Sequence, residues 1–347
     1  MQRTTTQHKF TQKVVISLMS VALVFGMLSL TACNSSNNAT NPSSNITVKN
    51  QTSVQEIDRD VSIEKTTLID IPEATISADS ISFQNDSLKL MLTMTNKTSK
   101  PISIQAGTLG FSANYINNYM VDDGYIGTDL EPNESKTADV FFNSNLFKMF
   151  GINKIGEIGI GITIKNNQTS KDYSKVNYDL IHREVVSIKT SQYDSVDMNV
   201  DTYPEAITNE DLLHTLDLTI LKFSKEDSFD QNGISIKSLG LFKNTDGETS
   251  VALEIQNTNN LLVSANASDV TINNEMAYEG SWIGEAIAPN KIAVMVITLN
   301  DVVSMAQDNE NIQNIDLENI STVGIKFTVF DENSNTIVSP TELEFNF

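Results

Sequence analysis

The sequence predicts an all-β protein with two tandem β-sandwich domains. Three observations predict it: apolar residues recur at every second position, turn residues separate the alternating segments, and the whole pattern occurs twice along the chain. The chain has 347 residues, of which 39% are hydrophobic, which is enough for two cores of ordinary composition. We expect four segments, a leader, a tether and two domains, over 1–32, 33–55, 56–195 and 196–347.

The leader has the order of an export signal. Arg3, Lys9 and Lys13 make its start positive, an uncharged and mostly apolar run covers 14–30, and the motif LTAC ends at Cys33. This motif resembles the lipobox of bacterial lipoproteins. The resemblance implies that Cys33 receives a diacylglyceryl group and becomes the first residue after cleavage. The alternative is an uncleaved transmembrane helix, because about 17 apolar residues is the lower limit for crossing a bilayer.

The segment 33–55 is rich in Asn, Ser and Thr and has few large apolar side chains. Such a segment cannot bury enough surface to offset the entropy lost on ordering, so it predicts a flexible tether. A lipid on Cys33 would then hold the folded part at the extracytoplasmic face of the cell membrane.

The two domains are predicted to be duplicates because matching segments recur at nearly constant spacing. Residues 90–96 match 251–257 at an offset of 161, and residues 158–164 match 323–329 at an offset of 165. The pairs that match at an offset of 157 are Tyr125-Ile126-Gly127 with Trp282-Ile283-Gly284, Pro132-Asn133 with Pro289-Asn290, and Asn143 with Asn300. The offset changes only between matched segments, where turns absorb insertions.

Each matched segment alternates with the period of a strand. In 88–95, leucine and methionine at the even positions alternate with residues that would form a wet face, and in 158–165 isoleucine alternates with Gly, Thr or Lys. Pairs such as Asn232-Gly233 and Asp246-Gly247 predict tight turns between strands. Short helices are expected only over 144–150, 301–307 and 207–216. Many short strands with regular turns favour sandwiches of the immunoglobulin-like type.

These features together resemble extracellular repeats of Gram-positive surface lipoproteins. The resemblance lies in a strand that ends in Asn, a turn before Tyr/Trp-Ile-Gly, a Pro-Asn turn and a final apolar strand. Those repeats are similar to the immunoglobulin-like, telokin-like modules of surface proteins. The likeness covers 60–190 and 215–347 and implies a fold and a location, without an activity. The cysteine pair of antibody domains is absent.

Charge and cysteine content exclude several classes of function. The formal net charge of -21 repels nucleic acid, whose phosphates are bound by Lys and Arg. A single cysteine excludes an internal disulfide and any metal site with several cysteines. With His8 in the leader, only His182 and His214 remain, too few for a three-histidine zinc site, and no G-x-S-x-G motif accompanies them. We therefore expect no catalytic residues, no metal and no cofactor.

A calcium-loop pattern is incomplete. Asp331, Asn333, Asn335 and Glu342 occupy positions 1, 3, 5 and 12 of the template, but Thr336 stands where the template requires glycine. The pattern favours a hairpin turn over 331–335 between the last two strands.

The matched aromatic residues Tyr125 and Trp282 are the candidate binding residues. Exposed aromatic side chains stack on sugars or anchor protein partners, whereas the alternative is that both fill a core or edge position of the fold. The sequence as a whole predicts a non-catalytic lipoprotein whose domains act as binding or spacer modules, with a membrane and a surface protein or glycan as partners. The alternative is an extracellular enzyme or a calcium-binding module.

Overall fold

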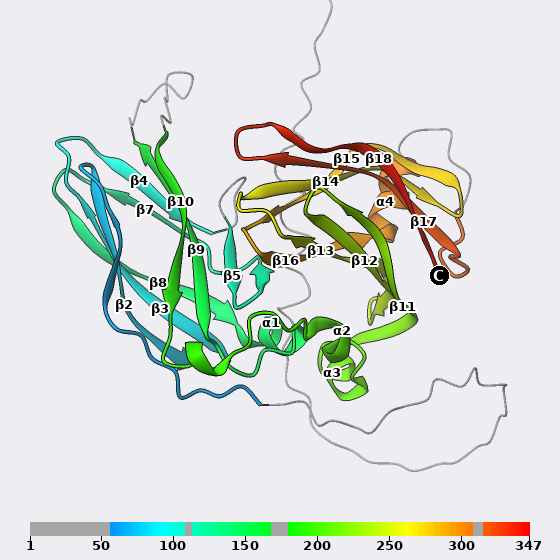
Figure 1. Cartoon of the computed structure of the whole chain (residues 1–347), viewed down its shortest axis with the longest axis horizontal. Coiled ribbons are helices and arrows are strands. Elements are labelled where there is room, and N and C mark those ends of the chain that lie inside the picture. Colours follow the sequence, from blue (N-terminus) through cyan, green and yellow to red (C-terminus); the bar gives the residue numbers. More distant parts are fainter. Residues whose placement is uncertain (1–55, 108–112, 168–179, 308–314) are drawn as a thin grey trace, which may run out of the picture. The chain divides into compact units, whose positions relative to one another are not determined.

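The computed structural model describes residues 56–107, 113–167, 180–307 and 315–347. The predictions for the leader, Cys33 and the tether lie outside these residues. Strands make up most of the described chain, which confirms the all-β class (Figure 1).

Three sheets contain all the paired strands of the described part. The first sheet has the order β1 (Thr66–Asp70), β2 (Ala74–Gln84), β3 (Ser87–Asn96), β8 (Ser135–Asn143). The third has the order β15 (Glu275–Ile287), β14 (Val263–Ile272), β17 (Thr322–Asp331), β18 (Thr336–Asn346). The second, ten-stranded sheet has the order β11 (Leu218–Gln231), β12 (Ile234–Asn244), β13 (Thr249–Asn257), β16 (Lys291–Thr298), β6 (Tyr119–Val121), β5 (Asn114–Ile116), β9 (Glu157–Asn166), β4 (Ile102–Ala106), β7 (Ile126–Leu130), with β10 (Leu180–Lys189) beside β9.

The strand order repeats along the chain. The order β1-β2-β3-β8 recurs as β11-β12-β13-β16, and the order β7-β4-β9-β10 recurs as β15-β14-β17-β18. Helix α1 (Ser144–Met149) follows β8, and helix α4 (Leu299–Gln307) follows β16. Below, strands β1–β10 are the first copy and strands β11–β18 the second copy.

Two fully buried asparagines occupy equivalent places in the copies. Asn96 ends β3 and Asn257 ends β13. In each case the side-chain Nδ2 donates to three backbone carbonyl oxygens, those of Lys100, Leu130 and Glu131 in the first copy and those of Leu261, Ile287 and Ala288 in the second. Each asparagine therefore joins the end of its strand both to the turn that follows it and to the start of the Pro-Asn turn after β7 or β15.

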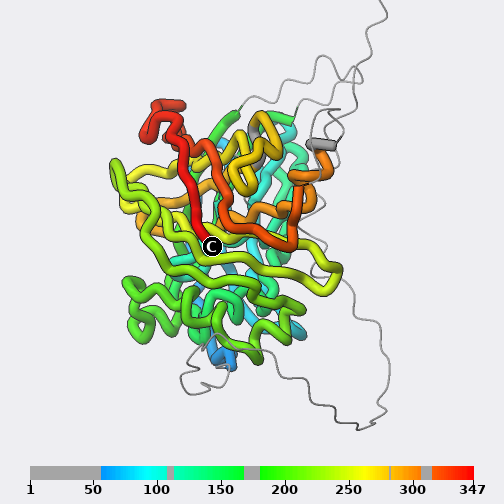
Figure 2. Tube along the Cα trace, turned by 90° about the vertical axis from the view of Figure 1, so that its right-hand side faces the viewer, coloured from blue at the N-terminus to red at the C-terminus, as the bar shows by residue number. Residues whose placement is uncertain are grey.

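Most local predictions for turns and helices agree with the structure, but the turn expected before Trp282 is absent because β15 runs without interruption over Glu275–Ile287, and α2 was not expected. Asn133 and Asn290 both adopt a positive φ in the two Pro-Asn turns, and Asn232-Gly233 forms the turn between β11 and β12. Helices α1 and α4 lie where they were expected, and α3 (Glu210–Thr215) lies within 207–216, after α2 (Tyr203–Ala206). In Figure 2 the tube through α2 and α3 is green and continues into β11.

Strand β9 is buried on both faces, whereas β3 has one buried face and one half-buried face. Alternation in β3 holds, because Leu88, Leu90, Leu92 and Met94 are buried and the residues between them are half-buried. In β9, however, Gly159, Gly161 and Thr163 are buried along with the isoleucines. The second face of β9 is covered because the Tyr115 ring of the neighbouring strand β5 packs over Gly159.

A hairpin present in only one copy joins the two copies. Between β4 and β7 the first copy inserts β5 and β6, whereas Asn273-Asn274 directly connect β14 to β15 in the second. Strand β5 pairs with β9, and β6 pairs in parallel with β16. The described residues of both copies and their connection belong to one compact unit.

Side chains cross between the copies in both directions. The core of the first copy includes Leu239, Phe242, Ala252 and Ile292 of the second copy, and the core of the second copy includes Ala113, Tyr115 and Met120 of the first. The connection 190–217 contributes Tyr203 and Ile207 to the first core. The predicted boundary between 195 and 196 stays a prediction.

Candidate functional site

The outer face of the third sheet carries an uncharged polar hollow. Alternation in β14 buries Val263, Ala265 and Ala267 and turns the residues between them outward. On the neighbouring strand β17, Phe327 and Val329 are buried, so the flanking residues also face outward. The hollow has a volume of about 510 Å³ and is lined by Ser264, Asn266, Ser268, Thr328, Phe330, Ser334 and Pro340.

Its polar groups have unused hydrogen-bonding capacity. Asn266 Nδ2 donates to the Ser264 backbone carbonyl (3.1 Å) and to its hydroxyl (3.2 Å). The Asn266 side-chain carbonyl and the Thr328 hydroxyl form no hydrogen bond within the described residues. Gly284 of β15 lies beside Asn266 in register, and a methyl group at Gly284 would come within 2.5 Å of Asn266 Oδ1. The glycine thus keeps the amide accessible from the side of β15.

The first copy carries an equivalent row of three residues across its sheet, but there a lysine is hydrogen-bonded to the amide side chain of the row. Gly127, Gln105 and Thr163 align across β7, β4 and β9, as Gly284, Asn266 and Thr328 align across β15, β14 and β17. Two residues after the threonine, the first copy has Lys165 where the second has Phe330. Lys165 Nζ donates to Gln105 Oε1 at 3.2 Å. In the first copy, therefore, the side-chain oxygen of Gln105 is already hydrogen-bonded to a charged lysine.

The two aromatic candidates lie near these faces. Tyr125 directly precedes β7, and its side chain is 61% exposed, so it does not fill a core position. Trp282 lies in β15 where the pairing of β14 with β15 shifts register. The side chain of Trp282 lies outside the described part of the structure.

The calcium-loop residues form the expected hairpin turn between β17 and β18. Asp331 Oδ1 accepts hydrogen bonds from the backbone N–H groups of Asn333 (2.9 Å) and Asn335 (2.8 Å), and Oδ2 accepts one from Asn335 Nδ2. The hydrogen bond from the Asn335 side chain is the main cause of a lowered pKa of Asp331. Glu342 lies within β18, opposite Lys326. The Asp331 carboxylate therefore holds the turn.

The two histidines of the described chain lie apart from the hollow. His182 is in β10, where its Nε2 lies 3.0 Å from Glu184 Oε2. His214 is in the last turn of α3. Within the described ranges, no three His, Cys, Asp or Glu side chains come together as a metal site would require.

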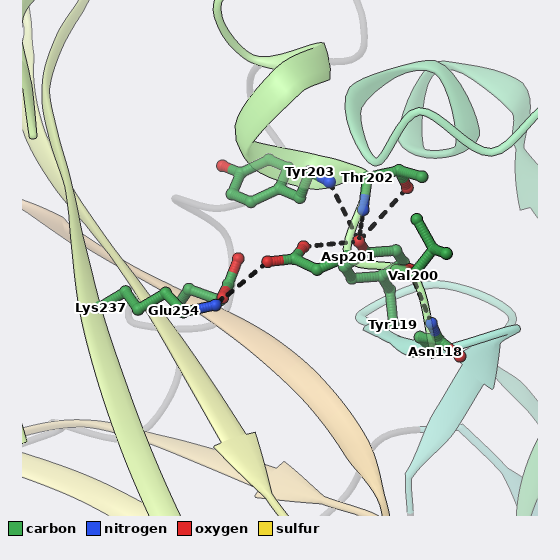
Figure 3. A network of polar contacts seen from close by, with 8 residues as sticks. All are labelled: Asn118, Tyr119, Val200, Asp201, Thr202, Tyr203, Lys237 and Glu254. Atoms are coloured by element: carbon green, nitrogen blue, oxygen red, sulfur yellow. Dashed lines mark hydrogen bonds and ion pairs between the residues drawn. The ribbon is translucent and has the colours of Figure 1, made fainter. Parts of the chain in front are cut away.

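A second polar cluster, the junction network, lies between the copies (Figure 3). Lys237 of β12 reaches Glu254 Oε1 of β13 at 3.0 Å and Asp201 Oδ2 of the connecting segment at 3.2 Å. Asp201 Oδ1 in turn accepts a hydrogen bond from the Tyr119 hydroxyl of β6 (2.9 Å). That hydroxyl also accepts from the backbone N–H groups of Thr202 and Tyr203. The network ties the connection to both copies.

In this network Lys237 is the cationic partner of two carboxylates, those of Glu254 and Asp201, and the two carboxylates repel each other. Burial, followed by repulsion from the Asp201 carboxylate, raises the pKa of Glu254 to about 7. Burial also opposes the charged form of Lys237, but the hydrogen bond and charge of Glu254 outweigh it and raise the Lys237 pKa. The hydrogen bond and charge of Lys237 lower the Glu254 pKa, but by less than burial and the Asp201 carboxylate raise it. Glu254 is 2% exposed, and its Oε2 has no hydrogen-bond partner in the described structure.

A second ion pair stabilises the β5–β6 hairpin against the second copy. Lys291 of β16 lies 2.8 Å from Glu157 Oε2 of β9, and its Nζ also donates to the Asn117 carbonyl. The Lys291 ammonium sits 4.1 Å from the centre of the Tyr115 ring. Burial opposes the charged form of Glu157, but hydrogen bonds from Lys291 and Ser187 outweigh it and lower the Glu157 pKa.

Sequence reasoning missed both the hollow and the junction network. A glutamate inside the apolar segment VALEI was the available signal for Glu254, because a charge on a buried strand needs a partner. The signal for the hollow was the exchange of Lys165 for Phe330 between otherwise matched segments.

No protein-family model matches the chain, and no curated protein matches it. Among solved structures, it is similar to Amycolatopsis orientalis exo-chitosanase CsxA, both alone (9% identity) and as a variant in complex with PNP-beta-D-glucosamine (10% identity). Each comparison has a TM-score of 0.18, and the alignments cover 75% and 72% of this chain. The chain spans about a quarter of the length of those enzymes, with 26% and 25% covered. A TM-score this low assigns neither fold nor function.

Among the described residues, no helix has the length and apolar character needed to cross a bilayer.

Proposed function

We propose that this chain is a non-catalytic lipoprotein, anchored through Cys33 at the extracytoplasmic face of a cell membrane, whose second copy presents a binding face. The anchor is supported by the sequence alone: a basic start, an apolar run and the LTAC motif precede an Asn- and Ser-rich tether. Two acyl chains hold a protein stably at a membrane where one does not.

The binding role rests on one observation, the uncharged polar hollow of the second copy. A sheet face that served only as a spacer would need no accessible amide, yet Gly284 leaves one open at Asn266. Solvent-facing hydrogen-bonding groups in a concave surface are typical of ligand sites.

The anchor and the binding role are tested separately. Radiolabelled palmitate should enter the wild-type chain and not Cys33→Ala, and label that persists in the variant would contradict the anchor.

For the binding role, the unlipidated chain from residue 33 onward, carrying Cys33→Ser, is mixed with isolated cell envelopes and sedimented. We expect the wild type to be retained and Asn266→Ala to be retained less, with Gln105→Ala, the matched change in the first copy, as the control. Equal retention of all three proteins, or retention of none, would contradict a binding face on the second copy.

A further inference from the structure

We propose that the hollow of the second copy binds a neutral carbohydrate, one or two sugar rings of a longer glycan. This inference rests on the proposed binding function and names its ligand class. It also assigns the two copies different tasks, because in the equivalent row of the first copy the Gln105 side-chain carbonyl already accepts a hydrogen bond from Lys165.

Charge argues for a neutral ligand. The chain carries a formal charge of -21, yet none of the seven side chains that line the hollow is ionisable. An anionic ligand would need a free Lys or Arg, and the nearby Lys326 is paired with Asp269 at 3.3 Å. A cationic ligand would draw on carboxylates, which the lining lacks. Desolvating a charged ligand here without a partner would cost more than a neutral surface returns.

The mixture of polar and apolar groups argues for a sugar. Asn266 offers both an amide donor and a carbonyl acceptor, and the hydroxyls of Ser264, Ser268 and Thr328 donate or accept equally well. A sugar ring presents hydroxyls of the same dual character at its edge and C–H groups on its faces. Phe330 and Pro340 supply apolar rings in the same hollow for those C–H faces. The volume of about 510 Å³ lies within the range of small-molecule sites.

The difference between the copies supplies a built-in comparison. In the first copy Lys165 donates to Gln105 Oε1, so the amide that a sugar would use is engaged, and the aromatic ring of Phe330 has no counterpart. Thr163, the counterpart of Thr328, is 4% exposed. The two rows share backbone register and differ in accessibility, so changes at matched positions separate ligand binding from sheet stability.

The test uses the unlipidated chain from residue 33 onward and two readouts. In the first, envelopes are treated with periodate, which cleaves the vicinal diols of sugars, before the sedimentation assay. In the second, cellotetraose, maltotetraose, mannotetraose and N-acetylchitotetraose compete for the wild-type chain on untreated envelopes. We expect periodate to abolish retention and at least one neutral oligosaccharide to displace the chain.

Variants locate the contact. Asn266→Ala and the isosteric Thr328→Val should each weaken binding of the displacing oligosaccharide by about tenfold, the effect of one or two lost hydrogen bonds. Gln105→Ala should bind as the wild type does. Thr328→Val keeps its shape on an outward face, so it reports on binding even if Asn266→Ala disturbs the sheet.

The outcomes distinguish this inference from the proposed function. Retention that survives periodate and resists all four oligosaccharides would overturn the carbohydrate assignment while the binding function stands. A loss of binding in Gln105→Ala equal to that in Asn266→Ala would also overturn it. If untreated envelopes retain no chain, the proposed function itself fails.

Discussion

At the scale of single residues, two carboxylates share one lysine, an electrostatic conflict that the alternating strand pattern of the sequence does not reveal. Glu254 sits on a central strand of the second copy, faces the connecting segment and shares Lys237 with Asp201. Three charges with a net value of minus one meet there, and the Glu254 side chain is almost fully buried while those of Lys237 and Asp201 are 25% and 22% exposed. The proton therefore binds Glu254 more tightly in the folded chain than in the unfolded one.

This conflict predicts a pH-dependent stability. Because the pKa of Glu254 rises from 4.5 to about 7 on folding, the folded state is favoured below pH 4.5, and this advantage is lost as pH rises through 7. Glu254→Gln removes the titration while keeping the shape. Between pH 5 and pH 8 the free energy of unfolding of the wild type should fall by roughly 1–3 kcal/mol more than that of the variant. Urea unfolding at both pH values measures this.

An exposed acid provides the control. Glu226 of β11 is exposed, and Glu226→Gln should leave the pH dependence of the wild type unchanged. If Glu254→Gln and the wild type show parallel pH profiles, Glu254 is not the group that titrates.

At the scale of elements, a three-residue strand decides how the copies meet. Strand β5 lies close to β9 because Gly159 has no side chain under the Tyr115 ring. A methyl group at Gly159 would come within 2.0 Å of that ring. The position of β6, and through it the pairing with β16, therefore depends on one glycine.

Replacing this glycine should loosen the hairpin. Gly159→Ala forces β5 away from β9 and should cost about 1–3 kcal/mol of stability, as overpacking does. The amide of Ile292, which donates to the Asn118 carbonyl, should then exchange with deuterium faster. In the control Gly127→Ala the nearest atom is the Tyr125 hydroxyl at 3.1 Å, at the end of an exposed side chain. Unchanged exchange at Ile292 in Gly159→Ala would refute the dependence.

Short strands such as β5 and β6 could not be predicted from the sequence. The strands that alternate over many residues, such as β3 and β13, were predicted because each carries its own periodic signal. Strands β5 and β6 have three residues each, too few to show a period, and they pair with partners far away in sequence. The hollow was missed for another reason: a sequence shows which residues point outward, but not that Lys165 folds back onto Gln105.

At the scale of the whole molecule, the two copies share a sheet and parts of their cores. The offsets of the matched segments anticipated the repeated strand order, since 161, 157 and 165 relate the rows Gln105 to Asn266, Gly127 to Gly284 and Thr163 to Thr328. They gave no information on how the copies associate, because the hairpin that joins them occurs once. Side-chain burial across the junction couples the stability of one copy to that of the other.

Cooperative unfolding follows from this coupling. Heating should unfold the described part in one calorimetric transition. Lys291→Met leaves the Glu157 carboxylate without its cationic partner and should lower stability by about 2–4 kcal/mol, as removal of one member of a buried pair does. Adding Glu157→Gln should recover much of the loss, because no unpaired charge then remains. Two resolved transitions in the wild type would contradict the coupling.

The inserted hairpin also has a consequence for solubility. Within its own copy, β16 ends a sheet of four strands, and such an edge offers free N–H and C=O groups to any extended chain that meets it. The first copy occupies the start of that edge, where Tyr119 of β6 pairs with Ile292 and the Ile292 N–H donates to the Asn118 carbonyl, so no neighbouring molecule can pair with β16 there. A chain without residues 114–121 should therefore aggregate at concentrations where the intact chain stays dispersed.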